Sequence, residues 1–215
     1  MKMKFALAAA TLAASSLAHS ATIDWNTWTS NTTGAISSTP VTVTFTGQTN
    51  GGWYASYPSW TPGATWADGT LVANGPSGSN GIVRLTGGNT NVNTVTFSQA
   101  VVNPVFAIWS LGQGGNTSSF NFIGATPVLV SGGASAEYSG SGISVAGNNV
   151  YGTEGNGTVE FIGTYTSLSW TNPVFEDWYG FNVGITAAAV PEPGSIGLLL
   201  AGLTLVGLVR RRQVK

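Results

Sequence analysis

The 215-residue chain contains no cysteine, so neither disulfide bonds nor thiolate metal sites are available to it. Only 7% of the residues are charged, and six of the seven basic residues lie in the first four or the last six positions. Between residues 21 and 186 there is one arginine, Arg84, and there is no lysine or histidine. This scarcity excludes a Ser-His-Asp triad, a Cys-His pair, a His-ligated zinc site and a lysine Schiff base from the body of the chain.

The body of the chain is acidic. One arginine against seven acidic residues gives residues 21–186 a net charge of −6. A domain with a single cation cannot neutralise several phosphates, so nucleic acid is excluded as a partner. The surface must instead be covered by serine, threonine, asparagine, glycine and aromatic side chains.

The N-terminus has the pattern of a secretory signal peptide. Lys2 and Lys4 precede an apolar run of about ten residues, and the small residues Ala18 and Ser20 stand where signal peptidase reads its substrate. An uncleaved membrane anchor would need a longer apolar run. The pattern predicts that residues 1–20 are a signal peptide, removed by signal peptidase before Ala21.

The C-terminus has the pattern of a short membrane anchor. Residues 196–209 are apolar and would form a helix of about 21 Å, which is shorter than the roughly 30 Å hydrocarbon core but can insert by thinning the bilayer. The arginines at 210–212 would remain in the cytoplasm. We therefore expect a linker over 187–195, a single short transmembrane helix over 196–209 and a basic cytoplasmic tail over 210–215.

The order of these C-terminal elements resembles a PEP-CTERM sorting signal. The residues that carry the resemblance are Pro191, Glu192 and Pro193, followed by the apolar segment and then Arg210, Arg211 and Arg212. The resemblance implies a Gram-negative bacterium that makes exopolysaccharide, and an exosortase, a membrane-embedded cysteine peptidase, that cuts near the motif. The domain would be periplasmic and held at the inner membrane before processing, and would then reach the cell envelope or extracellular matrix. A plain tail anchor is the alternative.

The body, residues 21–186, reads as one all-β domain, an antiparallel β-sandwich or jelly roll. Short alternating or β-branched runs are separated by turns rich in glycine, asparagine and serine. We expect a central strand, buried on both faces, over 105–109. The other predicted strands cover 41–45, 82–85, 92–97, 120–122, 127–130, 159–162, 165–170 and 178–185. The glycines of 152–157 are expected to form a hairpin into the strand at 159–162.

The stretch from Asn50 to Asn80 is predicted to be a long surface loop. It contains five aromatic residues within 14 positions: Trp53, Tyr54, Tyr57, Trp60 and Trp66. Such rings can stack on the C–H faces of sugars, and these five are the candidate glycan-contacting residues. The alternative is that they pack over the sheet as a small secondary core.

The acidic residues suggest two further possibilities. A glycosidase needs two carboxylates about 5 to 9 Å apart, and Glu154, Glu160, Glu176 and Asp177 could supply such a pair, although no spacing selects one. Carboxylates beside Gly/Asn turns also suit calcium, so Glu154, Asn156 and Asp177 are weak candidate ligands. No other cofactor is expected. Arg84 is expected to pair with an acid or to cover apolar surface.

These observations favour an exported, non-catalytic protein of the envelope or matrix that is structural or contacts exopolysaccharide. Two other classes stay open at this point. One is a secreted glycan hydrolase or lyase that uses paired carboxylates. The other is a self-associating surface protein without a ligand, since a weakly charged sheet surface favours edge-to-edge pairing.

Overall fold

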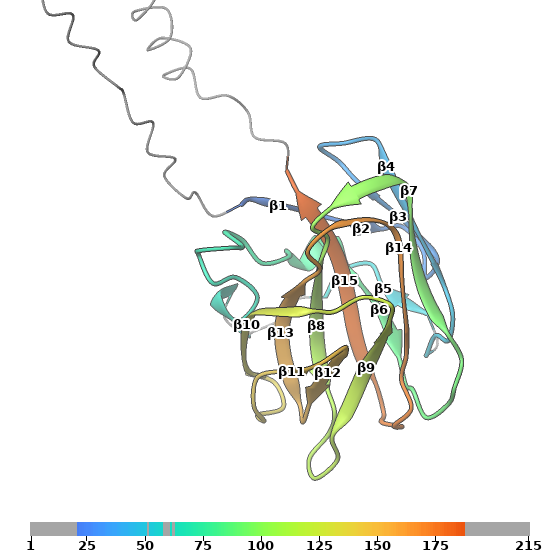
Figure 1. The fold of residues 1–215 in the computed structure, drawn as a ribbon. Coiled ribbons are helices and arrows are strands. Elements are labelled where there is room, and N and C mark those ends of the chain that lie inside the picture. The colour runs from blue at the N-terminus through green and yellow to red at the C-terminus, as the bar shows by residue number, and fades with distance from the viewer. Residues whose placement is uncertain (1–20, 51, 58–60, 62, 188–215) are drawn as a thin grey trace, which may run out of the picture.

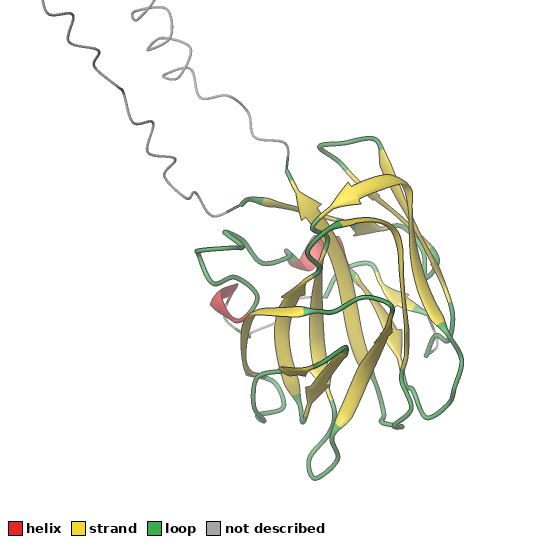
Figure 2. Ribbon diagram, in the orientation of Figure 1, coloured by secondary structure: helices red, strands yellow, loops and turns green. Residues whose placement is uncertain are grey.

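The computed structural model describes residues 21–187, except 51, 58–60 and 62. In this part the chain forms two β-sheets that face each other, and every pairing between strands is antiparallel (Figures 1 and 2). The predicted all-β fold is therefore confirmed for the described residues. The predicted signal peptide and the predicted transmembrane segment lie outside them.

We call the two layers sheet I and sheet II. Sheet I has the order β10 (Val128–Ala134), β13 (Gly155–Glu160), β8 (Val105–Leu111), β15 (Tyr179–Thr186), β6 (Ile82–Leu85) and β5 (Trp53–Tyr54), and β1 (Ile23–Trp25) pairs with the end of β15. Sheet II has the order β11 (Ser144–Ala146), β12 (Asn149–Gly152), β9 (Ser118–Ile123), β14 (Thr164–Thr171), β7 (Asn93–Val102), β4 (Val41–Thr46), β3 (Thr33–Ile36) and β2 (Thr27–Trp28). Two short 3-10 helices, η1 (Gly63–Thr65) and η2 (Gly78–Asn80), interrupt the connection from β5 to β6.

The nine strands expected from the sequence overlap β4, β6, β7, β8, β9, β10, β13, β14 and β15. The remaining strands have two to four residues each, too few to show an alternating pattern. The predicted hairpin at 152–157 is wrong, because β12 belongs to sheet II and β13 to sheet I, so the chain crosses between sheets there. Gly157 is therefore part of a strand and not of a turn. A side chain is excluded there by packing, because a Cβ atom would come within 2.5 Å of the Ile143 side chain.

The main core lies between the two sheets and is rich in aromatic rings. In β4 the alternation is complete, with Val41, Val43 and Phe45 buried and the intervening threonines exposed. Phe106 of β8 is at the centre of the ring cluster. Its ring centroid lies 5.5 Å from those of Phe122, Phe161 and Trp170 and 5.8 Å from that of Phe181. These edge-on and stacked contacts join the two sheets.

The outer face of sheet I carries a second hydrophobic cluster. All seven residues of β8 are buried, as the sequence predicts for a central strand. Val105, Ala107 and Trp109 of β8 face outward into this cluster, where they are covered by residues of the N-terminal segment and of the 50–80 stretch: Ile23, Trp25, Trp66 and Val72. The expected long loop is therefore a cover over sheet I.

The first and last described residues lie at the same end of the sandwich (Figure 1). The amide of Ala187 donates to the carbonyl of Thr22, and the register of β1 on β15 pairs Ile23 with Thr186. All described strands and both hydrophobic clusters come from residues between 21 and 186. Residues 21–187 therefore contain the elements of a complete folding unit.

We expect Phe106→Ala to lower the free energy of unfolding of the 21–187 domain by about 3 to 5 kcal/mol, because it leaves a cavity at the centre of the ring cluster. Urea unfolding followed by tryptophan fluorescence measures this change. Ile162→Ala is the control, since Ile162 is 60% exposed in the turn after β13, and its effect should stay within about 0.5 kcal/mol. Equal effects of the two substitutions would contradict the assigned core.

Candidate functional site

Four aromatic side chains from three distant segments meet beside the outer face of sheet I. We call Tyr54, Tyr57, Tyr138 and Trp178 the aromatic surface. The Tyr54 and Tyr57 rings are stacked with centroids 5.5 Å apart, and Trp178 lies edge-on to Tyr57 at 5.6 Å and to Tyr138 at 6.1 Å. Tyr54 is 37% exposed and Tyr138 is 49% exposed, so the cluster is open to solvent.

Hydrogen bonds connect the 50–80 stretch to the other two segments of this cluster. The side chain of Asn50 donates to the carbonyl of Asp177 over 2.8 Å, and the amide of Ala136 donates to the hydroxyl of Thr61 over 2.9 Å. Burial, together with the nearby Tyr138 and Glu137, raises the pKa of the Tyr57 hydroxyl. Tyr57 is therefore a neutral hydroxyl, available as donor and acceptor at any physiological pH.

The five aromatic residues singled out in the sequence divide into two groups. Tyr54 and Tyr57 belong to the aromatic surface. Trp66 is 3% exposed and packs on Trp109 with centroids 5.1 Å apart, and Trp53 packs partly buried against the main core. Trp60 lies outside the described residues. The expectation of a secondary core therefore holds for Trp66, whereas glycan contact by the exposed rings stays a prediction.

Tyr138 and Trp178 were not among the sequence-predicted site residues. They lie more than 80 positions from Tyr54 and Tyr57 in the chain, and they approach them only because the β10–β11 and β14–β15 connections reach the edge of this cover. Trp178, next to the acidic pair at 176 and 177, is an aromatic residue at the start of an expected strand. That position alone does not distinguish a surface ring from a core ring.

Arg84 also belongs to this region, although it is paired differently from the expectation of an acidic partner. Its guanidinium lies 4.8 Å from the centroid of the Tyr54 ring and donates to the Tyr54 hydroxyl over 2.6 Å. This cation–π contact fixes the orientation of Tyr54. Arg84 therefore supports the aromatic surface from the neighbouring strand β6.

The four carboxylates considered for glycan cleavage lie in different environments. Glu154 immediately precedes β13 and Glu160 is its last residue, which places them roughly 20 Å apart for six residues of extended chain. Asp177 is exposed, whereas Glu176 is 1% exposed. Partial burial and the nearby Asp68, not Glu154, raise the pKa of Glu160.

Glu176 is enclosed beside the turn that follows β8. The Gly112 amide donates to its carboxyl group, and the Glu154 amide donates to the Gly112 carbonyl over 3.1 Å. Burial raises the pKa of Glu176 to about 8, with smaller contributions in the same direction from the charges of Glu154 and Asp177. The carboxyl group is consequently protonated across most of the physiological range.

The weak calcium candidates have other contacts. The side-chain oxygen of Asn156 accepts from the amide of Ser110 over 2.7 Å, and Glu154 accepts from the hydroxyl of Ser110 over 2.7 Å. Within the described residues, no group of three or more histidine, cysteine, aspartate or glutamate side chains is arranged to hold a metal ion. Calcium binding by these residues stays a prediction.

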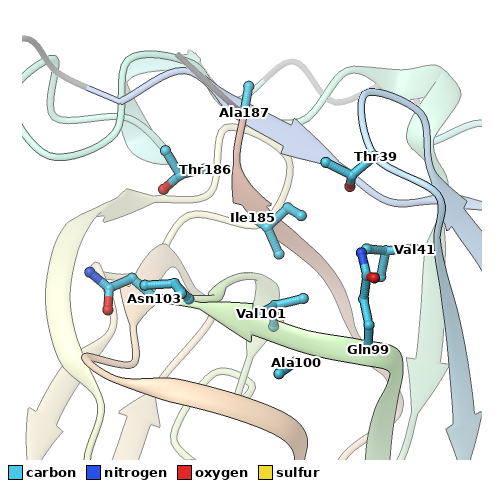
Figure 3. Close-up of a pocket in the computed structure, with 10 residues that line it drawn as sticks. Thr39, Val41, Gln99, Ala100, Val101, Asn103, Ile185, Thr186 and Ala187 are labelled. Carbon is cyan, nitrogen blue, oxygen red and sulfur yellow. The ribbon is translucent and has the colours of Figure 1, made fainter.

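A pocket of about 510 Å³ opens at the end of the sandwich where the described chain ends (Figure 3). Val41, Val101 and Ile185 contribute apolar side chains from β4, β7 and β15, and Thr39, Gln99 and Asn103 contribute polar ones. Ala187 is also part of the lining. None of the sequence-predicted site residues lines this pocket, which instead marks the place from which the chain continues toward its C-terminus.

Comparison with known families identifies that C-terminal continuation. Residues 189–213 match the family model of the PEP-CTERM protein-sorting motif. No curated protein and no solved structure matches the chain. No helix within the described ranges has the length and apolar character needed to cross a membrane, and the segment predicted to do so, 196–209, lies beyond them.

The match confirms the resemblance expected from Pro191–Pro193, the apolar segment and the arginine cluster. The motif begins two residues after Ala187, the last residue that the structure describes. It implies export, membrane anchoring of the C-terminal motif before processing, and processing by an exosortase.

Glu176 gives the domain a specific pH dependence. Its pKa is raised from 4.5 to about 8 on folding, so the folded state retains a proton that the unfolded state loses. The contribution of this proton to the free energy of unfolding is fully present below about pH 4.5 and decreases as the pH rises toward 8. In Glu176→Gln we expect this loss to disappear, so the variant gains stability over the native protein by up to about 1.4 kcal/mol per pH unit in that window.

Urea unfolding at a series of pH values measures this difference. Asp177→Asn is the matched control, because it removes a carboxylate from the adjacent, exposed position and should leave the slope nearly unchanged. A Glu176→Gln variant whose stability keeps the native slope between pH 5 and 8 would contradict the assignment of a buried, protonated carboxyl group.

Proposed function

We propose that this exosortase-sorted protein is a non-catalytic component of the cell envelope or extracellular matrix that contacts exopolysaccharide through its aromatic surface. The observation that carries the proposal is the meeting of Tyr54, Tyr57, Tyr138 and Trp178 in one solvent-open cluster. Aromatic faces stack on the apolar faces of sugar rings, and phenol and indole groups hydrogen-bond to hydroxyls.

The rings of the aromatic surface are held in place before any ligand arrives. Tyr54 contacts Tyr57, Trp178 and the guanidinium of Arg84, and Trp178 contacts all three tyrosines. Side chains that are already fixed lose little conformational entropy on binding. Such a surface suits the repeated weak contacts that a polymer makes along its length.

The charges around the aromatic surface favour a neutral glycan. Glu137 is close enough to raise the pKa of Tyr57, and the exposed Asp177 precedes Trp178. The guanidinium of Arg84 is already engaged with Tyr54. A strongly anionic polymer would meet two carboxylates against the single cation of Arg84 at this surface, so we expect preference for uncharged sugars and weak dependence on salt.

The position of the aromatic surface fits a protein attached at the opposite end. Trp178 immediately precedes β15, and the described chain ends just after that strand, about 26 Å farther along for eight extended residues. The aromatic surface therefore lies away from the end at which the C-terminal motif is attached, so that attachment leaves it accessible.

Glycan hydrolysis is the second candidate, and the raised pKa of Glu176 is the observation that favours it, because a general acid needs such a value. Against it, Glu176 is 1% exposed and does not line the 510 Å³ pocket at the end of the sandwich. Release of reducing ends from the exopolysaccharide by the native domain, lost in Glu176→Gln, would favour this candidate over a non-catalytic role.

We expect Trp178→Ala and Tyr54→Ala each to weaken retention of the 21–187 domain on the producer's own exopolysaccharide by about tenfold, since stacking on one aromatic ring contributes roughly 0.5 to 1.5 kcal/mol beyond area burial. Affinity electrophoresis measures retention, with and without calcium. Retention that requires calcium would direct attention to Glu154, Asn156 and Asp177.

The matched control for these variants is Phe175→Ala, which removes a 59% exposed ring from outside the aromatic surface. Thermal unfolding of each variant verifies that the fold is retained. Unchanged retention in both aromatic-surface variants, or an equal loss in Phe175→Ala, would contradict the proposal. No retention of the native domain on any exopolysaccharide would remove it entirely.

The sorting motif yields a separate prediction in producing cells. Replacing Pro191, Glu192 and Pro193 by alanine should stop exosortase processing, so the uncut chain accumulates in the inner-membrane fraction. Immunoblots of membrane, envelope and medium fractions measure this redistribution. The control is the Trp178→Ala chain, which keeps the motif and should be processed normally. Normal release of the triple-alanine chain would contradict exosortase processing at this motif.

A further inference from the structure

The last residues of β7 have a partner strand on one side only. β4 pairs with β7 as far as Val43, which lies opposite Phe97, whereas β7 itself continues to Val102. On its other side, β7 is paired with β14 at Val101 and Val102. Within the described residues, the side of β7 that β4 leaves therefore has no paired strand from Gln99 to Val102. We call this stretch the open edge of β7.

The sequence at the start of β4 explains why this edge stays open. Pro40 immediately precedes β4 and has no amide hydrogen to offer to a neighbouring strand. The amide of Val41 donates to the carbonyl of Thr39 over 2.7 Å, and the amide of Thr42 donates to the hydroxyl of Ser98 over 3.0 Å. The first donors of β4 are thus satisfied without the backbone of the open edge.

The 510 Å³ pocket at this end of the sandwich lies along the open edge (Figure 3). Val101 and Ile185 line it, but they are only 4% and 6% exposed, so a ligand would bury little apolar surface there. The pocket instead borders a strand edge with unpaired backbone groups, which is a template for the addition of an extended segment. These features favour an extended peptide over a compact ligand.

The described chain ends at the wall of the same pocket. Ala187 is part of the lining, and its amide donates to the carbonyl of Thr22 over 2.8 Å, which fixes the point from which the chain continues. An extended chain advances about 3.3 Å per residue, so Val190 can lie about 10 Å from Ala187. The residues that follow Ala187 are therefore the first extended segment within reach of the open edge.

The sequence of residues 190–194, Val-Pro-Glu-Pro-Gly, has the pattern of an edge strand. In an extended strand, successive residues direct their backbone N–H and C=O groups to alternate sides. Val190, Glu192 and Gly194 have amide hydrogens that would face one side, whereas Pro191 and Pro193, which have none, alternate with them. Proline also favours an extended backbone in the residue before it. Such a segment can pair with a strand on one side only.

We propose that residues 190–194 of this chain pair with the open edge of β7 as an added outermost strand, with the amides of Val190, Glu192 and Gly194 facing β7. The segment includes the Pro-Glu-Pro part of the sorting motif. The motif that an exosortase reads is then held against the folded domain, and processing acts on the chain in which this added strand has separated from β7.

A spin label attached beyond the segment tests the contact. The chain has no cysteine, so Ser195→Cys in a chain of residues 21–195 provides a single site for a nitroxide. We expect the amide NMR signals of residues 99–102 to lose intensity, while those of residues 113–116, in the turn at the opposite end of β8, keep theirs. At least one amide of residues 99–102 should also exchange its hydrogen about tenfold more slowly in residues 21–195 than in residues 21–187.

Two substitutions at position 192 form a matched pair. Glu192→Pro removes the central amide hydrogen of the segment and keeps an extended backbone, so both the signal loss and the slowed exchange should disappear. Glu192→Gln keeps the amide and should retain both effects. Position 192 lies outside the folded domain of residues 21–187, so these comparisons do not depend on a change within its core.

Three results would overturn the inference. The first is unchanged signal intensity at residues 99–102, and the second is an equal loss of intensity in Glu192→Pro. The third comes from a mixture of spin-labelled chains without ¹⁵N and ¹⁵N-labelled chains without the nitroxide. Signal loss in that mixture equal to the loss in the doubly labelled chain would assign the segment to a second copy of the protein.

Discussion

The burial of strand β8 on both of its faces is the constraint on which the rest of this structure depends. Its inward residues form the centre of the ring cluster between the sheets, and its outward residues need a second cover. A sheet that left Val105, Ala107 and Trp109 in water would lose the stabilisation of a whole hydrophobic cluster. The N-terminal strand and the 50–80 stretch provide that cover, which explains why so many aromatic residues are concentrated in a stretch with little regular structure.

The cover also produces the features with functional interest. Two hydrogen bonds hold Trp66 over Trp109. The indole N–H of Trp66 donates to the carbonyl of Ile108, and the hydroxyl of Thr158 donates to the carbonyl of Trp66. Where the cover ends, Tyr54 and Tyr57 emerge at the surface beside Trp178 and Tyr138. The same packing that closes sheet I also encloses the indole Nε1–H of Trp109, which has no hydrogen-bond partner among the described residues.

The sandwich has two chemically different ends. At one end Ala21 and Ala187 lie together beside an open pocket, and the sorting motif follows within two residues. Toward the other end lie the buried, protonated carboxyl group of Glu176 and the aromatic surface. For a chain that is exported and anchored through its C-terminal motif before processing, this arrangement separates the attachment end from the end that carries Glu176 and the aromatic surface.

Much of this protein is determined by the sequence itself. The C-terminal sorting motif depends only on local order, because peptidases read extended peptides, so Pro191–Pro193, the apolar segment and the arginine cluster were sufficient to predict it. The all-β class and the nine longer strands were also predictable, since alternation and β-branched runs are properties of neighbouring residues.

Only the tertiary structure decided how the chain crosses between sheets at Thr153 and Glu154, which aromatic rings are buried and which carboxyl group is enclosed. Trp66 and Tyr57 lie in the same aromatic-rich stretch, yet Trp66 is buried against Trp109 of β8 whereas Tyr57 stays partly exposed. Tyr138 and Trp178 join the aromatic surface from connections more than 80 residues away. Burial is a property of distant partners brought together by strand pairing, so no local pattern of residues could assign it.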